Sequence, residues 1–357
     1  MLKKRAIFLI KLLLTATFLY LLWRMTDQHG LAERMANLDM RYLGLFVLVG
    51  IAMLLVSNAK WHVLMAIHGP RPGFWATLRI YFIGYYFSAL LPSNFGGDAA
   101  RAYLAGGVTG SSTSAATSVF MERVTGLVVL FALVAVMPLI GPPMLRQPAF
   151  VVPALACGAA LVVMLAAGVF RRPLVSLVQA TSTRLLNWKR TRRLAPLLEW
   201  LGRFFLDAGQ ALSALGSNRT TAFYVWLLTA VFYLLVWFNI LVAYRTFGFD
   251  PPMEFVFVTP YVQFAASLPV AVGGNLGYSE GVFAYYYSLI GIAVEATLAI
   301  AILTRLKTWT FALIGMGFFL ASGQRSRLMS RPARSSQRSP AGEEVPTSLD
   351  HNSPSAR

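Results

Sequence analysis

The sequence predicts an all-α integral membrane protein, a polytopic helical bundle with two broken, re-entrant helical hairpins that form an inverted-topology repeat. Of its 357 residues 57% are hydrophobic, yet the formal net charge is +17. This combination is typical of apolar spans flanked by basic loops. The phrase L-P-x-x-x-G-G-(D/N) occurs twice, at residues 91–98 and 268–275, each time after an apolar stretch. Matching interruptions in the two halves of a chain indicate an internal repeat.

Long apolar runs recur from one end of the chain to the other. They cover residues 6–23, 42–58, 74–92, 113–138, 150–170, 220–243, 254–272 and 281–320. The first run follows Lys3, Lys4 and Arg5, and no small-x-small cleavage site precedes Trp23 and Arg24. We interpret this run as a retained signal anchor.

The distribution of Lys and Arg predicts the topology, because basic loops stay on the cytoplasmic side. Both termini and segment 171–219 are basic, which places them in the cytoplasm and the chain in the cell inner (plasma) membrane. Lys60 to Arg71 is a further basic marker on that side. Three apolar runs separate it from segment 171–219, so one of them must enter and leave on the same side.

The run from 74 to about 110 is the candidate for this re-entrant hairpin, because Pro92, Gly96 and Gly97 break it. In the second half, residues 254–292 are broken by Pro269 and a glycine pair, and the charges place this hairpin in the opposite sense. Two full spans over 254–292 satisfy the charges equally well.

The domain organisation follows from these runs. Residues 1–320 form the transmembrane domain, with repeat halves at about 42–138 and 220–320. The basic cytoplasmic linker 171–219 mixes Leu and Trp with Arg, which predicts an amphipathic helix on the inner leaflet. The polar tail 322–357 is expected to be disordered. Tyr285 to Tyr287 is expected to belong to an interfacial aromatic belt.

Several function classes are disfavoured by the composition. The basic residues flank spans and form no groove-reading domain, which argues against a nucleic-acid partner and favours anionic lipids. A P-loop is absent, the four histidines have no metal spacing, and Cys157 is a lone cysteine. We therefore expect no cofactor and no metal.

Charged side chains inside apolar helices are the candidates for function. Asp98 and Arg101 share a helix face if residues 97–105 are helical, and then form a pair. Alternatively, Asp98 caps the helix while Arg101 snorkels to the interface. Glu122 and Arg123 point about 100° apart on a helix and need other partners. Those available are Asp98, Arg101, Glu280 and Arg305.

The candidate ligand-binding residues gather at the two breaks and on the helices that follow them. The Gly-Gly turns expose backbone N–H groups that suit a phosphate, whereas the alternative role of the charges is to fix helix packing. The candidates are Asn94, Gly96, Gly97, Asp98, Arg101, Glu122, Arg123, Gly273, Gly274, Asn275, Glu280 and Arg305.

Three motifs carry a resemblance to a known family: P-S-x-x-G-G-D-x-x-R at 92–101, E-R-x-x-G at 122–126 and P-x-x-x-G-G-x-x-G-x-x-E at 269–280. Together they resemble the lysylphosphatidylglycerol synthase transmembrane region, or flippase-like domain, family. The resemblance implies a module that moves lipids between leaflets. The 37-residue tail after residue 320 leaves no room for an aminoacyl-transferase domain, so lipid synthesis is not expected.

These observations predict a lipid translocase, and not an enzyme, for a phospholipid with an anionic headgroup or a polyprenyl-phosphate-linked lipid. Two alternatives stay open. One is a membrane-embedded transferase with Glu122 or Glu280 as general base. The other is a non-catalytic partner that docks a separate lipid synthase through segment 171–219. The sequence leaves the headgroup, direction, energy source and oligomeric state undetermined.

Overall fold

The computed structural model describes residues 38–68, 72–90, 96–170, 195–268 and 275–322, together with Thr17 and Tyr20, and the side chains of helix α9 from residue 202 onward. By its contacts the chain divides into two compact units, Met1–Phe318 and Phe319–Arg357. Several predicted features lie outside the described residues. They are the first apolar run, the turns that contain Asn94, Gly273 and Gly274, the linker up to residue 194 and the tail from residue 323.

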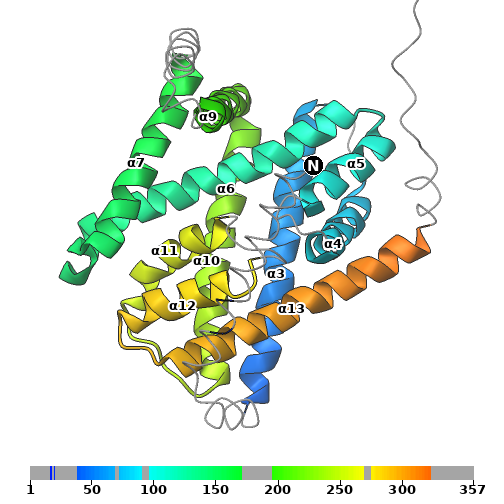
Figure 1. Ribbon diagram of the computed structural model, residues 1–357. Coiled ribbons are helices and arrows are strands. Elements are labelled where there is room, and N and C mark those ends of the chain that lie inside the picture. The colour runs from blue at the N-terminus through cyan, green and yellow to red at the C-terminus, as the bar shows by residue number, and fades with distance from the viewer. Residues whose placement is uncertain are drawn as a thin grey trace, which may run out of the picture. The chain divides into compact units, whose positions relative to one another are not determined.

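The described part of the chain contains ten α-helices and two short 3₁₀-helices, which confirms the predicted all-α class (Figure 1). The bounds are α3 Met40–Met65, α4 Phe74–Leu90, α5 Gly96–Thr109, α6 Ser112–Ile140, α7 Pro148–Val169, α9 Ala195–Gly216, α10 Arg219–Thr246, α11 Phe255–Ser267, α12 Tyr278–Ser288 and α13 Val294–Ala321. The 3₁₀-helices are η1 Ala66–His68 and η2 Pro143–Arg146.

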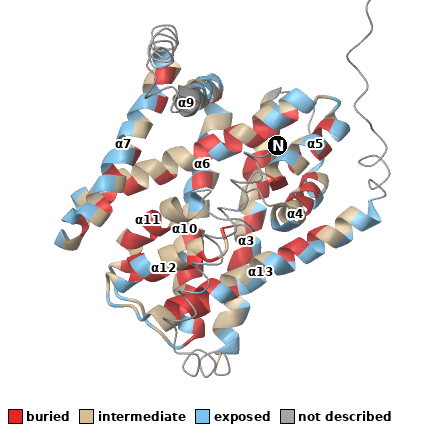
Figure 2. Ribbon diagram, in the orientation of Figure 1, coloured by how far each residue is buried: buried red, intermediate tan, exposed pale blue. Residues whose placement is uncertain are grey.

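Five of these helices, α3, α6, α7, α10 and α13, are long and apolar enough to cross a membrane. Helices α3, α6, α7 and α10 coincide with predicted runs to within a few residues, except that α3 continues seven residues beyond position 58. Helix α13 covers only the second part of the predicted run 281–320, because α12 occupies its first part. Figure 2 shows exposed positions along these helices. Leu155, Leu165 and Leu313 are large apolar residues that are exposed there. Lipid tails cover such surfaces, so the chain is an integral membrane protein.

Two pairs of shorter helices stand where the breaks were predicted. Helix α4 packs against α5, and α11 packs against α12. Helices α11 and α12 have 13 and 11 residues, which at 1.5 Å per residue gives about 20 and 17 Å. Neither length crosses a hydrocarbon core of about 30 Å, so the lengths of α11 and α12 favour a hairpin over two full spans. The inverted relation between the halves stays a prediction.

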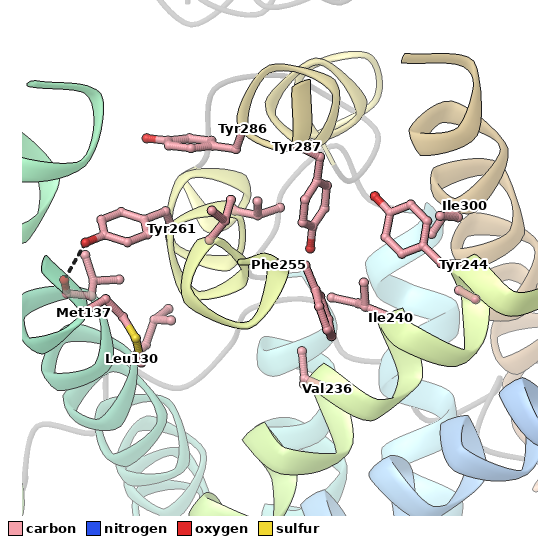
Figure 3. Packing of buried hydrophobic residues seen from close by; sticks show 14 of the residues in the cluster. Leu130, Met137, Val236, Ile240, Tyr244, Phe255, Tyr261, Tyr286, Tyr287 and Ile300 are labelled. Atoms are coloured by element: carbon pink, nitrogen blue, oxygen red, sulfur yellow. Dashed lines mark hydrogen bonds between the residues drawn. The ribbon is translucent and has the colours of Figure 1, made fainter. Parts of the chain in front are cut away.

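A single large core joins the second half to α6 and α7. Tyr261 donates a hydrogen bond to the Val134 carbonyl at 3.1 Å, and the Tyr287 and Thr259 hydroxyls lie 3.0 Å apart. Figure 3 shows Tyr261 pointing from α11 toward α6 and Tyr287 pointing from α12 toward Phe255. The prediction that Tyr285 to Tyr287 form an interfacial belt is therefore wrong for Tyr286 and Tyr287, which are buried. Tyr286 donates to the Ala149 carbonyl at 3.3 Å and the Tyr287 hydroxyl contacts that of Thr259, so neither hydroxyl is buried without a partner.

Helix α9 lies within the predicted linker and packs on α7 and α6. Gly209 faces Gly168 so closely that a Cβ there would meet the Gly168 nitrogen at 2.5 Å. Ser213 adds a hydrogen bond to the Gly168 carbonyl at 3.0 Å. The apolar face of α9 thus covers other helices of the same chain.

Helix α13 contacts elements of both halves. Near its carboxyl end, a Cβ on Gly315 would meet the Phe82 carbonyl oxygen of α4. The rings of Phe311 and Phe318 lie 5.9 and 5.8 Å from that of Phe82. Near its middle, Arg305 reaches α12. This arrangement places α13 beside both hairpins.

Candidate functional site

Helix α5 begins at the first break and carries two of the predicted charges. Asp98 is the third residue of the helix, in the first turn, where a negative charge is favoured by the helix dipole. One turn later, Arg101 Nη2 donates to Asp98 Oδ1 at 3.0 Å. The predicted pair is confirmed, and Asp98 is not the N-cap because the helix starts at Gly96.

Arg101 is buried, with 5% of its side chain exposed, so the interpretation that it snorkels is wrong. Its guanidinium carbon lies 4.3 Å from the Tyr81 ring centroid and 5.0 Å from that of Trp61. These aromatic faces stabilise a cation held away from water. Gly84 leaves the room for it, because a Cβ at Gly84 would meet Arg101 Cγ at 2.7 Å. Its Nη1 nitrogen has no hydrogen-bond partner among the described residues.

Glu122 on α6 is the second carboxylate beside Arg101. Its Oε2 lies 2.8 Å from Arg101 Nη2, an ion pair whose angles fall outside those of a hydrogen bond. Tyr81 donates its hydroxyl proton to Oε1 at 2.9 Å. Lys60, also buried, donates to the Glu122 backbone carbonyl at 3.2 Å. Both Glu122 oxygens are therefore engaged.

Arg123 is the exposed member of this group, with 58% of its side chain accessible. Its Nε donates to Asp98 Oδ2 at 2.7 Å. Because Arg123 pairs with Asp98 and Glu122 with Arg101, the prediction that the two neighbours do not pair with each other is confirmed. The ion pair fixes the arginine by its Nε and leaves Nη1 and Nη2, which make no hydrogen bond to a described residue, available.

We call Lys60, Asp98, Arg101, Glu122 and Arg123 the first-half cluster. Its three cations and two carboxylates leave one positive charge when every group is ionised. An uncompensated charge at membrane depth costs roughly 2.5 to 3.5 kcal/mol on insertion scales. The cluster is therefore suited to receive a negatively charged group, and Arg123 is its accessible cation.

The second break carries a smaller group, Asn275, Ser279, Glu280 and Arg305, which we call the second-half cluster. Arg305 Nε donates to Glu280 Oε1 at 2.6 Å, and Arg305 Nη2 donates to Ser279 Oγ at 2.8 Å. Ser279 in turn lies 3.0 Å from Glu280 Oε2. The carboxylate and the guanidinium neutralise each other, so this cluster carries no net charge.

Asn275 fixes the backbone at the start of the second limb. Its φ is 61°, a left-handed conformation in which asparagine is among the better tolerated residues. Its side-chain nitrogen donates to the carbonyls of Ala266 and Leu268 at 3.0 and 2.6 Å. Asn275 therefore has a structural role that ties the two limbs of the hairpin together.

Gly97 also has a packing role. A Cβ on Gly97 would meet Ser88 Oγ and the Gly84 carbonyl oxygen of α4, so only glycine permits this close approach. Gly96 is buried beside it. Anion binding by the backbone of this turn stays a prediction.

Sequence reasoning missed four side chains at these sites. Lys60 was interpreted as a cytoplasmic marker but is buried against Glu122, because α3 extends through it. Trp61, Tyr81 and Lys307 were not singled out. A lysine in the middle of the last apolar run was a signal for Lys307, whereas the aromatic contacts of Arg101 arise only from tertiary packing.

A family model supports an assignment for the whole membrane region. The model of the lysylphosphatidylglycerol synthase TM region matches residues 8–315. No curated protein and no solved structure matches the chain. The matched stretch contains both hairpins and both clusters, and the family suggests a link to lipid metabolism. The protein belongs to the lysylphosphatidylglycerol synthase TM region family.

Proposed function

We propose that this protein is a lipid translocase of the cytoplasmic membrane, with both termini in the cytoplasm. It moves a lipid with an anionic headgroup, a phospholipid or a polyprenyl-phosphate-linked lipid, from one leaflet to the other. The headgroup travels along the protein while the acyl chains stay in the bilayer. Arg123 is the residue that first holds its phosphate.

The single observation that carries this proposal is the position of Arg123. It is an exposed arginine on a membrane-spanning helix, and Asp98 holds it by Nε at 2.7 Å. A guanidinium oriented in this way presents Nη1 and Nη2 to a phosphate as a bidentate donor. When all five groups of the first-half cluster are ionised, its one extra positive charge supports the same assignment, because an anionic headgroup offsets it.

The contacts of the carboxylates favour binding over chemistry. Glu122 accepts from Tyr81 and pairs with Arg101, and Glu280 pairs with Arg305 and Ser279. A general base needs an oxygen free to take a proton from a substrate. Since these oxygens are already engaged, we assign the carboxylates to charge balance and not to group transfer.

Lipid flipping in proteoliposomes tests the proposal. The probes are fluorescent phosphatidylglycerol, aminoacylated phosphatidylglycerol and polyprenyl phosphate, and the variants are Arg123→Gln and the control Arg245→Gln. Arg245 pairs with the exposed Asp250 at the end of α10. Loss of a hydrogen bond to a charged group is worth about 1.5 to 3 kcal/mol, so Arg123→Gln is expected to slow flipping roughly tenfold or more.

Arg245→Gln is expected to flip at the wild-type rate, and both variants are expected to elute as folded protein in size-exclusion chromatography. Unchanged flipping by Arg123→Gln would remove Arg123 from the site. No flipping of any probe by folded wild-type protein would exclude translocation of these lipids.

A further inference from the structure

Lys307 is a charged residue outside both clusters. It lies in the middle of α13, a helix of 28 residues that is apolar enough to span the membrane. Ionisable residues at such positions are expensive to insert and usually serve a function. Neither hairpin cluster includes it.

The surroundings of Lys307 hold it in one place. Its Nζ donates to Asn239 Oδ1 of α10 at 2.5 Å and lies 4.3 Å from the ring centroid of Phe46 on α3. Asn239 is itself oriented, because its amide nitrogen donates to the Phe46 carbonyl at 2.9 Å. Gly50 makes room for the aliphatic stem, since a Cβ there would meet Lys307 Cδ at 2.7 Å.

The charge of Lys307 is not balanced by these contacts. Among the described residues, no carboxylate forms an ion pair with it, in contrast to Arg101, Arg123 and Arg305. An ammonium has three donors, and the amide oxygen of Asn239 accepts only one of them. Two donors and a full charge are left for a ligand.

The neighbours of Lys307 indicate from where a ligand arrives. Lys307 is partly exposed, and Ile314, two turns further along the same face of α13, is 42% exposed. Large apolar side chains exposed on a spanning helix face lipid tails. A ligand that reaches Lys307 along this surface is a membrane lipid, and its negative group balances the ammonium.

We infer that Lys307 is a second binding position for a membrane lipid whose phosphate-containing headgroup carries a net negative charge, distinct from the position at Arg123. Lysine binds a phosphate as a compact point charge, whereas arginine binds it as a planar fork. The proposed binding site is inferred from the surroundings of Lys307 and does not depend on translocation. Its use as a second station during translocation rests on the proposed function.

Native mass spectrometry of the full-length protein in detergent tests the site. The probes, at equal concentration, are dihexanoyl-phosphatidylglycerol, dihexanoyl-phosphatidylcholine and inorganic phosphate. Wild-type protein is expected to retain the phosphatidylglycerol and to bind the other two at least tenfold more weakly. Lys307→Met, which keeps the stem and removes the charge, is expected to bind one phosphatidylglycerol fewer.

A matched pair of glycine variants on α3 gives a second measurement that leaves the lysine in place. Gly50→Ala displaces the Lys307 stem and is expected to weaken the same binding event at least tenfold. Gly44→Ala is the control, because a Cβ at Gly44 meets nothing within 4 Å. It is expected to bind as the wild type does.

Unchanged binding by folded Lys307→Met or by Gly50→Ala would overturn the inference. Equal, Lys307-dependent binding of phosphatidylcholine or of inorganic phosphate would overturn it as well, because the site would then not select an anionic lipid. Flipping measured on the same preparations separates the two proposals. Binding that depends on Lys307 without any flipping contradicts only the translocase, and flipping with Lys307-independent binding contradicts only the second site.

Discussion

Arg305 on α13 pairs with Glu280 on α12 at 2.6 Å, and the two residues lie 25 positions apart in the chain. Asp98 and Arg123 form the corresponding pair in the first half at 2.7 Å, with the same separation of 25. In both halves a carboxylate in the first turn after the break binds an arginine on the next long helix. The separation supports a common origin for the halves, and the two pairs differ mainly in exposure.

The pair of the second half, with 19% of the Arg305 side chain and 11% of the Glu280 side chain exposed, is expected to contribute strongly to stability. Arg305→Gln leaves Glu280 without its cation, and breaking a buried ion pair from one side costs about 3 to 5 kcal/mol. The double variant Glu280→Gln, Arg305→Gln removes both charges and is expected to be more stable than either single variant. Thermal unfolding in detergent, followed by size-exclusion chromatography, measures the difference.

The exposed ion pair between Arg245 and Asp250 provides the control for these variants. Exposed ion pairs contribute about 0 to 1 kcal/mol, so Arg245→Gln is expected to leave the melting temperature nearly unchanged. If the double variant is no more stable than Arg305→Gln, an unpaired Glu280 does not destabilise the protein.

Tyr81→Phe is expected to weaken the first-half cluster without disturbing its packing. The ring above Arg101 stays, whereas the hydrogen bond to Glu122 at 2.9 Å is lost. A hydrogen bond to a charged group contributes about 1.5 to 3 kcal/mol. In a double-mutant cycle with Glu122→Gln, the effect of Tyr81→Phe is expected to fall by at least half, as read from melting temperatures. Additive effects would argue against direct coupling.

Gly97→Ala is expected to separate α4 from α5 and to reduce both folded yield and flipping. The added methyl would meet Ser88 and the Gly84 backbone, and overpacking of this kind costs about 1 to 3 kcal/mol. Gly107→Ala on the same helix is the control, since nothing lies within 4 Å of its added Cβ. That change is expected to be neutral or slightly stabilising, because alanine favours helix by up to about 1 kcal/mol over glycine. Equal behaviour of the two variants would contradict the packing role of Gly97.

The inverted topology predicts labelling from opposite sides of the membrane. Trp75 at the start of α4 and Met253 just before α11 are 70% and 80% exposed, and cysteines introduced there mark the bases of the two hairpins. An impermeant maleimide is expected to reach Trp75→Cys from the cytoplasmic side and Met253→Cys from the outside, in sealed vesicles of each orientation. The wild type is the blank because Cys157 is buried. Labelling from the same side would exclude the inverted repeat.

Much of this fold was predictable because a membrane-spanning helix can be recognised from the length of its apolar stretch in the local sequence. The five spans follow from apolar length, and the two breaks from proline and glycine. The pairing of Asp98 with Arg101 follows from helix spacing, and the separate partners of Glu122 and Arg123 follow from the angle between neighbours.

Burial was not predictable in the same way. Arg101 and Arg123 are the same residue type near the same break, yet one is enclosed by Trp61 and Tyr81 and the other is exposed. That difference depends on how α3 and α4 pack against α5, which no local pattern reveals. The same holds for Lys60, whose charge suggested a loop while its partner is the Glu122 carbonyl.

The path of α13 has a mechanical consequence. Helix α13 has 28 residues and is therefore about 42 Å long at 1.5 Å per residue. Arg305 pairs with Glu280 of α12, and Gly315 packs closely against the α4 backbone. A tilt of α13 that weakens its contact with one hairpin also moves the part of α13 that contacts the other hairpin. We therefore expect movements of the two hairpins to be coupled through α13.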